Sequence, residues 1–331
     1  MTPRVGVVGA GQWGRNLMRN FAALGALAAA YDENVATLTR ELAAYPQARA
    51  ARSLAEVLGD PSVDAVVIAT PAATHGRLAR RALDAGKHVF VEKPLSLDAD
   101  DARALGEHSE RLGLTLMVGH LLLYHPAFIA LQRFIAEGRI GPLRYIYSNR
   151  ASLGRIRREG SALWEFAPHD VSMILALTGA LPERVTCVGG AWLKPGVSDL
   201  TLSHFRFPSG VQAHIFVSWL HPYKDHRLVV VGADGMAVFD DVAKDAAKLL
   251  HYPHAVGWTG DLPTVTKAAA IAIPYDADEP LGRECRHFLD CVATGRRPLS
   301  DWREGHRVLA VLETCQRALA SGEAVRQAAA E

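Results

Sequence analysis

The sequence predicts an α/β fold in two domains, residues 1–121 and residues 122–331. Up to about residue 120, short apolar runs alternate with helical patterns, which is the order of a parallel sheet covered by helices on both faces. Beyond that point, runs with strand character follow one another and helical patterns return only near the C-terminus. This order is typical of an α+β domain with a largely antiparallel open sheet. A chain of 331 residues is long enough to bury one sizeable core in each domain.

The first predicted strand leads into a site for a dinucleotide. Val5–Val8 is apolar throughout, as in a strand buried on both faces, and the stretch GAGQWG follows it directly. From Arg15 to Leu24, apolar side chains recur at helical spacing. A strand, a G-x-G-x-x-G turn and a helix in this order bind a pyrophosphate, because the glycines let the backbone approach it and the helix start offers free N–H groups. The candidate contacts are Gly9, Gly11, Gln12, Trp13 and Gly14.

The second predicted strand, Gly25–Tyr31, ends in a carboxylate that selects the cofactor. Asp32 stands where an acidic side chain accepts hydrogen bonds from the ribose hydroxyls of a bound dinucleotide. A carboxylate there would repel a 2′-phosphate, and Glu33 adds a second negative charge. The sequence therefore favours NAD over NADP.

The alternation of strands and helices continues to residue 119. The predicted elements are strand Val63–Thr70, helix Thr74–Ala85, strand Val89–Val91, helix Leu97–Leu112 and strand Leu114–Gly119. Ligands of such sheets bind outside the carboxyl ends of the strands. Thr70-Pro71 and Glu92-Lys93 lie there, so we expect these four residues at the cofactor. His75 either borders the nicotinamide or only begins a helix.

The second domain begins with a helix and continues as a block of strands. We expect a helix over Pro126–Glu137 and strands over Leu143–Asn149, Glu183–Gly189, Leu200–Phe207, Val211–Trp219 and Arg227–Phe239. Several of these runs alternate apolar and polar residues, which indicates strands with one exposed face. The stretch 208–210 (PSG) is a hairpin signal between two of them. Helices over 282–293 and 302–320 are expected to close this domain.

One helix of the second domain carries polar groups in a pattern that suggests chemistry. It includes residues 164–175 (WEFAPHDVSMIL), and Pro168 is expected near its start, where first-turn N–H groups lack partners anyway. Glu165 and His169 are then four residues apart and share one face. We expect this carboxylate and imidazole to meet Lys93 of the first domain.

Together these motifs resemble one known family. GAGQWG, then VEKPLS, then APHD on a helix are similar to the Gfo/Idh/MocA oxidoreductases, and the resemblance extends over nearly the whole chain. It implies a Rossmann domain that binds NAD or NADP, and a second domain that presents a sugar, an inositol or a similar substrate. It also implies that Lys93 is a catalytic acid/base or orienting donor and that a cis peptide precedes Pro94. His169 matches the histidine of the family's second signature, whereas Glu165 stands where the family has an aspartate.

The residue types suit the oxidation of a secondary alcohol. This reaction needs a base that takes a proton while hydride leaves carbon for a nicotinamide. A lysine with a lowered pKa can act as this base, and the pKa of histidine is already near neutral. Lys93 and His169 would divide the work, one taking the hydroxyl proton and the other holding the hydroxyl or relaying the proton. Glu165 is either a third catalytic group or a partner that supports these two.

Within the family, the resemblance points to one group of substrates. The stretches LWEFAPHD and SWLHPYK are most similar to members that oxidise the 3-hydroxyl of UDP-N-acetylglucosamine, or of its uronate, to a ketone. An aminotransferase then converts the ketone to an amine, as in lipopolysaccharide or lipid A sugar biosynthesis. Those members usually have aspartate at the position of Glu165 and often at that of His221. The alternatives are a dehydrogenase of a free sugar, a sugar phosphate or inositol, and a non-catalytic relative that binds NAD(H), against which Lys93 and His169 argue.

Four further residues are candidate substrate contacts. His120 and Tyr124 lie where the chain crosses between the two domains. Arg155 and Arg157 belong to a basic loop before the signature helix. This loop is either solvated or clamps a diphosphate, since guanidinium groups pair well with phosphate oxygens.

Composition argues against several other functions. The net charge of +1 gives no bias toward nucleic acid or an anionic membrane, and no apolar stretch is long enough to span a bilayer. The first residues lack a signal-peptide pattern and the four cysteines lack CxxC spacing, so we expect a cytoplasmic protein with reduced thiols. The histidine and cysteine spacings fit no standard metal site, so no metal is expected. An open sheet face needs cover, so we expect a homodimer or homotetramer.

Overall fold

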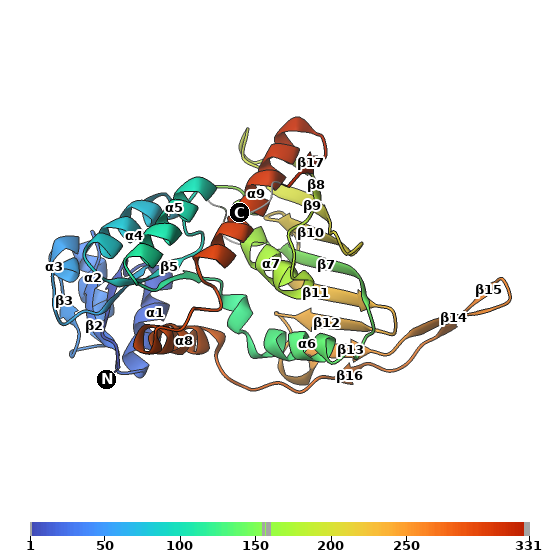
Figure 1. Cartoon of the computed structure of the whole chain (residues 1–331), viewed down its shortest axis with the longest axis horizontal. Coiled ribbons are helices and arrows are strands. Elements are labelled where there is room, and N and C mark those ends of the chain that lie inside the picture. Colours follow the sequence, from blue (N-terminus) through green and yellow to red (C-terminus); the bar gives the residue numbers. More distant parts are fainter. Residues whose placement is uncertain (1, 154–155, 157–159, 328–331) are drawn as a thin grey trace. The chain divides into compact units, whose positions relative to one another are not determined.

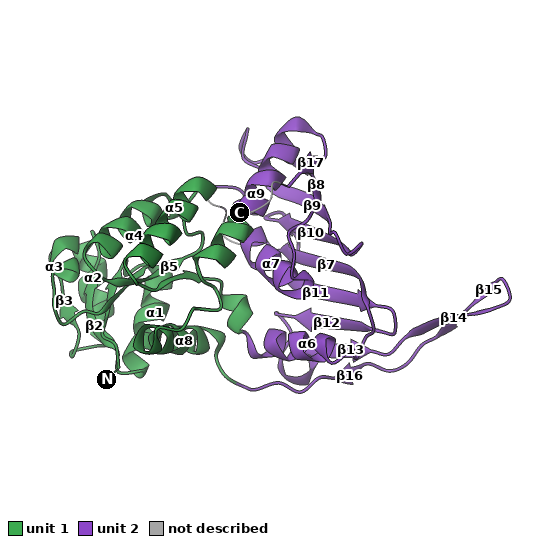
Figure 2. Cartoon of the chain, viewed as in Figure 1, with its two compact units in different colours: residues 1–124, 278–309 green, residues 125–277, 310–331 purple. Residues whose placement is uncertain are grey.

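The computed structural model describes residues 2–153, 156 and 160–327, and it divides the chain into two compact units. Unit 1 contains residues 1–124 and 278–309, and unit 2 contains residues 125–277 and 310–331 (Figure 2). The first division lies between Tyr124 and His125, close to the predicted one at 121–122. The segment 278–309 differs from the prediction, which placed it in the second domain, because the chain returns there to unit 1.

Unit 1 is built on a six-stranded parallel sheet in the order β3-β2-β1-β4-β5-β6 (Figure 1). Its strands are β1 (Val5–Val8), β2 (Leu27–Tyr31), β3 (Arg49–Ala50), β4 (Ala65–Ile68), β5 (His88–Glu92) and β6 (Leu116–Gly119). Its helices are α1 (Gln12–Ala23), α2 (Val35–Leu42), α3 (Leu54–Leu58), α4 (His75–Asp84), α5 (Ala99–Arg111), α8 (Pro280–Thr294) and the start of α9 (Trp302–Ser321), with the 3-10 turns η1 (Ala72–Thr74) and η2 (Leu121–Tyr124). The strand order reverses between β1 and β4, which is where open parallel sheets bind their ligands.

Aromatic packing explains why α8 belongs to unit 1. Phe288 of α8 lies edge-to-face against Phe21 of α1, with 6.3 Å between ring centroids, and against Phe90 of β5, at 5.6 Å. All three side chains are fully buried. Such pairs stabilise a core beyond the apolar area they bury. The helical pattern of 282–293 predicts the helix correctly but does not reveal which sheet it packs on.

Unit 2 is built on a nine-stranded mixed sheet in the order β16-β13-β12-β11-β7-β10-β9-β8-β17 (Figure 1). Its strands are β7 (Leu143–Ala151), β8 (Arg184–Gly190), β9 (Leu200–Arg206), β10 (Gln212–Ser218), β11 (Asp225–Gly232), β12 (Met236–Asp240), β13 (Leu249–Tyr252), β16 (Ile271–Ala272) and β17 (Val325–Arg326). The helices are α6 (Pro126–Ala136), α7 (Ala162–Thr178) and the end of α9, with the 3-10 turn η3 (Asp245–Ala247). A separate two-stranded ribbon, β14 (Ala255–Thr259) and β15 (Leu262–Thr266), is exposed along its whole length.

The prediction of a largely antiparallel open sheet is confirmed, with two differences in detail. Strand β10 pairs with β7 in parallel and with β9 antiparallel. The predicted single strand Arg227–Phe239 is wrong, because β11 and β12 form an antiparallel hairpin across the turn 233–235. This turn carries the sequence Ala-Asp-Gly, which is a hairpin signal.

The signature helix also differs from its prediction. Helix α7 begins at Ala162, after the N-cap residue Ser161, so Pro168 lies inside the helix and not in its first turn. A proline at this depth cannot donate the hydrogen bond that would reach the carbonyl of Trp164. Packing against β7, β9 and β10 compensates for this loss, since α7 contacts all three strands and most of its residues are buried.

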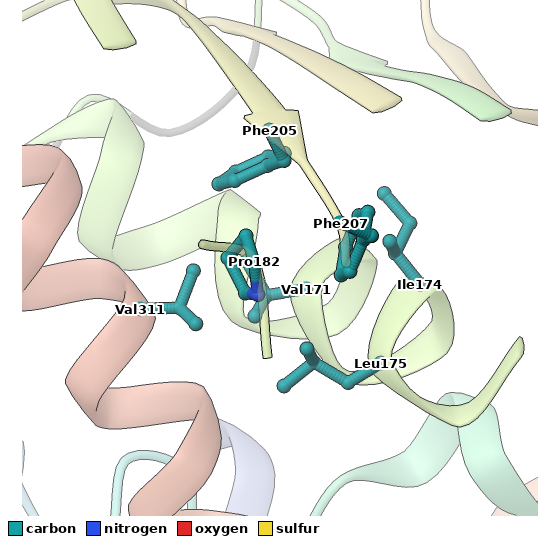
Figure 3. Close-up of a pocket in the computed structure, with 7 residues that line it drawn as sticks. All are labelled: Val171, Ile174, Leu175, Pro182, Phe205, Phe207 and Val311. Carbon is teal, nitrogen blue, oxygen red and sulfur yellow. The ribbon is translucent and has the colours of Figure 1, made fainter. Parts of the chain in front are cut away.

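Helices α7 and α9 and strand β9 line a small apolar cavity in unit 2. Figure 3 shows the side chains that line it, which are Val171, Ile174, Leu175, Pro182, Phe205, Phe207 and Val311. The cavity has a volume of about 10 Å³ and no polar lining. This is about the space of one water molecule, which would find no hydrogen-bond partner there, so the cavity is a packing defect and not a ligand site. In the described part of the chain, no helix combines the length and hydropathy needed to cross a membrane.

Candidate functional site

The glycine-rich turn of unit 1 has the form that a pyrophosphate site requires. Gly9 has a φ of +96°, which side-chain-bearing residues rarely adopt. A Cβ on Gly14 would lie 1.8 Å from the carbonyl oxygen of Gly9, so only glycine lets α1 approach the turn this closely. Space is open where a side chain of Gly11 would stand, and Gln12 begins α1 with its free N–H groups. The residues therefore fit a dinucleotide, as their sequence predicts.

Asp32 is anchored beside this turn. Its Oδ2 accepts a hydrogen bond from the main-chain N–H of Ala10 at 2.6 Å, and its Oδ1 accepts one from Asn34 at 2.8 Å. Each carboxylate oxygen has a second lone pair, so both remain able to accept bonds from ribose hydroxyls. The position and charge of Asp32 fit the ribose of NAD and oppose a 2′-phosphate.

The ends of β4 and β5 are joined by a buried histidine. His75 begins α4 and is only 1% exposed. Its Nδ1 lies 2.7 Å from the carbonyl oxygen of Pro94, and its Nε2 lies 2.9 Å from that of Thr70. Burial lowers the pKa of His75. The structure thus places His75 at a helix start, where its ring holds the turn after β4 against the turn after β5.

The turn after β5 carries the residues Glu92, Lys93 and Pro94. The Lys93–Pro94 peptide is cis, as the family resemblance implies. Lys93 is half-buried, whereas Glu92 is buried and its Oε1 accepts a hydrogen bond from Nε1 of Trp13. Direct contact between Glu92 and a cofactor stays a prediction, and the structure gives its carboxyl a partner inside the unit.

The polar atoms of His120 and Tyr124 are engaged inside unit 1. Nδ1 of His120 is hydrogen-bonded to Oε2 of Glu304, and the hydroxyl of Tyr124 lies 2.9 Å from Oγ of Ser300. Both predicted residues are at most 4% exposed. A role for them at the substrate stays a prediction. Arg155 and Arg157 lie outside the described residues.

In unit 2, helix α7 carries Glu165 and His169 on one face, four residues apart. Oε2 of Glu165 accepts a hydrogen bond of 2.8 Å from Nε1 of Trp219, which follows β10 and is 2% exposed. The side chain of Glu165, which is longer than the aspartate usual in the family, is therefore held by the sheet. Its negative charge lies near the start of α7, where the helix dipole favours it.

A buried ion pair beside His169 was not predicted. Nε of Arg150 donates to Oδ2 of Asp170 at 2.8 Å, and Oγ of Ser148 donates to Oδ1 at 2.6 Å. Asp170 is fully buried and Arg150 is 5% exposed. Nη1 of Arg150 lies 3.1 Å from Nδ1 of His226, whose pKa is lowered to about 3 by burial and by the charge of Arg150. A neutral His226 can accept this bond. The sequence signal for this ion pair is Asp170 in the stretch APHD, because a buried carboxylate needs a cation as its partner.

Each unit thus brings together part of the predicted set. Unit 1 collects the glycine-rich turn, Asp32 and Lys93 at the carboxyl ends of its strands, and unit 2 collects Glu165 and His169 on α7. Lys93 belongs to unit 1, whereas Glu165 and His169 belong to unit 2. The expectation that Lys93 meets them therefore stays a prediction. Among the described residues, no group of three or more histidine, cysteine, aspartate or glutamate side chains is arranged to hold a metal ion.

Comparison with known proteins gives consistent matches along the chain. Residues 3–120 match the oxidoreductase family GFO_IDH_MocA with its NAD-binding Rossmann fold, and residues 128–238 match the GFO/IDH/MocA C-terminal domain. The UDP-N-acetylglucosamine 3-dehydrogenase of Acidithiobacillus ferrooxidans is 31% identical over 93% of this chain and 94% of its own length. Its solved structure aligns with a TM-score of 0.84 over 96% of this chain and 97% of that one, at 29% identity. The scyllo-inositol 2-dehydrogenase (NAD(+)) of Bacillus subtilis is 29% identical over 74% of this chain and 72% of its own.

Proposed function

Because the chain belongs to the Gfo/Idh/MocA family of oxidoreductases, we propose that it oxidises the 3-hydroxyl of a UDP-N-acetylated sugar, UDP-N-acetylglucosamine or its uronate, to a ketone. The observation that carries this proposal is the similarity to UDP-N-acetylglucosamine 3-dehydrogenase along nearly the full length of both chains. The glycine-rich turn and Asp32 support NAD as the cofactor.

In this reaction, the carbinol carbon loses a hydride and its hydroxyl loses a proton, so that the C–O single bond becomes a carbonyl. Bound NAD supplies the hydride acceptor. Lys93, half-buried at the strand end, serves as acid/base or as the donor that orients the hydroxyl. His169 takes the complementary role, and Glu165 holds its charge beside it through Trp219. The resulting 3-keto sugar is a substrate for an aminotransferase.

A dehydrogenase of inositol, a free sugar or a sugar phosphate is the second candidate. It is supported by the match to scyllo-inositol 2-dehydrogenase and by a 31% identity to the inositol 2-dehydrogenase of Rhizobium meliloti over 71% of this chain. Both candidates use the same cofactor and the same polar groups, so only the substrate distinguishes them. A relative that binds NAD(H) without turnover is a third candidate, and Lys93 and His169 argue against it.

The deciding experiment measures NADH formation by its absorbance with purified protein, NAD and a panel of alcohols. The panel contains UDP-N-acetylglucosamine, its uronate, glucose 6-phosphate, myo-inositol and scyllo-inositol. Hydrazine is added to trap the ketone, because oxidation to a 3-keto sugar is unfavourable at equilibrium. We expect the kcat/KM for a UDP-sugar to exceed that for any polyol by at least about tenfold. This ratio corresponds to a difference of about 1.4 kcal/mol in transition-state binding.

Each outcome of the panel favours one candidate. Turnover only with an inositol or a sugar phosphate would replace the nucleotide-sugar proposal by the second candidate. No turnover with any alcohol, together with measurable NADH binding, would favour the non-catalytic relative. The reaction is proposed to take place in the cytoplasm, which suits four buried cysteines that form no disulfide.

We also propose that copies of this chain associate through the open face of the large sheet as a homodimer or homotetramer. Val188, Leu202 and Phe216 stand opposite one another across β8, β9 and β10, and Val188 and Leu202 are 59% and 41% exposed. An apolar row of this kind on one sheet face is typical of an interface.

Light scattering should give a mass of at least two chains for the wild type. The double substitution Val188→Lys with Leu202→Lys should lower this mass to that of one chain. Val256→Lys, on the exposed ribbon, is the control; a monomeric wild-type protein would contradict the proposal.

A further inference from the structure

A carboxyl group connects the glycine-rich turn to the lysine-bearing turn. Glu92 is the last residue of β5 and directly precedes Lys93. Lys93 is half-buried, whereas the carboxyl of Glu92 is buried. Its Oε1 accepts a hydrogen bond from the indole N–H of Trp13, in the first turn of α1. One side-chain contact therefore links the two motifs that the reaction needs.

The neighbouring strand leaves room for this carboxyl. Gly119 of β6 is paired with Glu92 in the sheet. A Cβ at Gly119 would lie 3.0 Å from Oε2 of Glu92 and 3.2 Å from its Cα. A Cβ at this position would press on the carboxyl, so Gly119 provides room for it beside Trp13.

A second carboxyl lies behind the first. Glu284 of α8 has no exposed surface, and within the described part of the chain neither of its oxygens has a hydrogen-bond partner. Burial first, and then the charges of Glu92 and Glu304, raise the pKa of Glu284 well above its usual range. Burial therefore favours the protonated form of Glu284, which carries an O–H that can be donated. Helices α1 and α8, which carry Trp13 and Glu284, pack on each other in unit 1 (Figure 1).

We propose that Glu92 is a positioning residue, which couples occupation of the glycine-rich turn to the orientation of Lys93 through its hydrogen bond to Trp13. The proposal rests on the proposed function for its effect on turnover, but the coupling itself belongs to the cofactor-binding unit. A dinucleotide bound at the glycine-rich turn lies beside Trp13. Its presence restricts the indole, which through its hydrogen bond to Glu92 restricts the end of β5. Because Lys93 follows Glu92 in the chain, a fixed carboxyl limits the directions that the lysine can take.

Ionisation of Glu92 gives this contact a measurable signature. Burial raises the pKa of Glu92 to about 7, and the bond from Trp13 and the charge of Lys93 oppose that rise. Above this pH the carboxyl is charged and accepts the stronger, charge-assisted bond; below it the carboxyl is neutral and the bond weakens. The titratable groups around it are Lys93 in its own turn, Glu284 on α8, His75 on α4 at the main chain of Glu92, and, beyond β6, His120 paired with Glu304.

The first test uses the protein without cofactor. The pH dependence of tryptophan emission is recorded for the wild type and for Trp13→Phe, and the difference isolates Trp13 from the other five of the six tryptophans. We expect this difference to titrate near pH 7 in the wild type and to be flat in Glu92→Gln. Glu284→Gln should keep the titration. Loss of the titration in Glu284→Gln with its retention in Glu92→Gln would assign the proton to the other carboxyl and overturn the proposal.

A matched control lies in the same unit. Oε1 of Glu110 on α5 also accepts a hydrogen bond from a tryptophan, Nε1 of Trp302 at 3.1 Å, but Glu110 is surface-exposed and far along the chain from the lysine-bearing turn. Glu110→Gln should leave both the Trp13 titration and turnover as in the wild type. An equal change in Glu110→Gln and Glu92→Gln would mean that only general stability is affected.

The second test measures coupling with and without turnover. NADH binding should shift the Trp13 titration in the wild type and not in Glu92→Gln, and this result does not depend on any sugar substrate. With a substrate from the panel, Glu92→Gln should lower kcat about tenfold with little change in KM, and the limb of the pH profile near 7 should disappear. A wild-type kcat and pH profile in Glu92→Gln would overturn the proposal. Failure of every sugar would instead contradict the proposed function and leave the NADH-dependent shift as the test of coupling.

Discussion

Replacing Lys93 by alanine is expected to lower kcat by about two to four orders of magnitude, the size of a general acid–base contribution, while NADH affinity stays within about threefold of the wild type. The reason is local to unit 1. Lys93 stands at the carboxyl end of β5, half-buried, on the turn that Trp13 and His75 fix from two other elements. The change removes an ammonium group and leaves the glycine-rich turn and Asp32 intact. Turnover would be followed by NADH absorbance, and affinity by energy transfer from tryptophan to NADH.

Two comparisons separate proton transfer from charge. Lys93→Arg keeps the positive charge but supplies a group that does not release its proton near neutral pH, so it should be as inactive as Lys93→Ala if proton transfer is the role. Lys87→Ala is the control within unit 1, because Nζ of Lys87 only donates to the carbonyls of Asp60 and Val63. It should lower thermal stability and leave kcat close to normal. An active Lys93→Ala enzyme would show that the base lies elsewhere, with His169 the next residue to test.

The nucleotide-binding part of the fold can be predicted from sequence because its physical requirements are local. A glycine with positive φ, a second glycine where a Cβ would strike a carbonyl, and an acid at the next strand end all lie within one βαβ unit. The placement of 278–309 cannot be predicted in this way. The helical spacing of α8 defines an apolar face, but its partners Phe21 and Phe90 are distant in sequence, and nothing in the pattern names them.

The site is predictable to the same degree. Position at a strand end identifies Glu92 and Lys93 together, but only the structure shows that the carboxyl of Glu92 is buried against Trp13 and Gly119. Pro168 illustrates the opposite error. Proline favours the first turn because it lacks an N–H, and the packing of α7 against the sheet compensates for the hydrogen bond that Pro168 cannot make. The partner of Asp170 was missed because a buried carboxylate requires a cation without indicating which strand provides it.

The buried ion pair on α7 should be the part of unit 2 most sensitive to a single substitution. Asp170 accepts bonds from Arg150 and from Ser148, and both charged groups are buried. The other carboxylate near Arg150, that of Asp241, is 4.0 Å from its Nη1 and so compensates the charge only weakly. Removing one member of a buried pair leaves an uncompensated charge, which typically costs about 3–5 kcal/mol. We therefore expect Asp170→Ala to lower the free energy of unfolding of unit 2 by about that amount.

Hydrogen exchange of the amides in β7 and α7 measures this loss in unit 2 alone, which a single melting curve of a two-unit chain would not. Asp170→Asn keeps the shape and one acceptor and should lose less. Arg150→Met combined with Asp170→Leu removes both charges and should recover much of the stability, because an apolar pair of similar volume is often neutral in such sites. If the double variant were as unstable as Asp170→Ala, the cost would come from the lost bonds of Ser148 and His226 and not from an isolated charge.

The ion pair should also affect turnover, because His169 directly precedes Asp170 on α7. We expect Asp170→Ala to lower kcat together with the hydrogen-exchange protection of α7. Recovery of kcat in the double variant would show that the ion pair acts on turnover through the position of the helix.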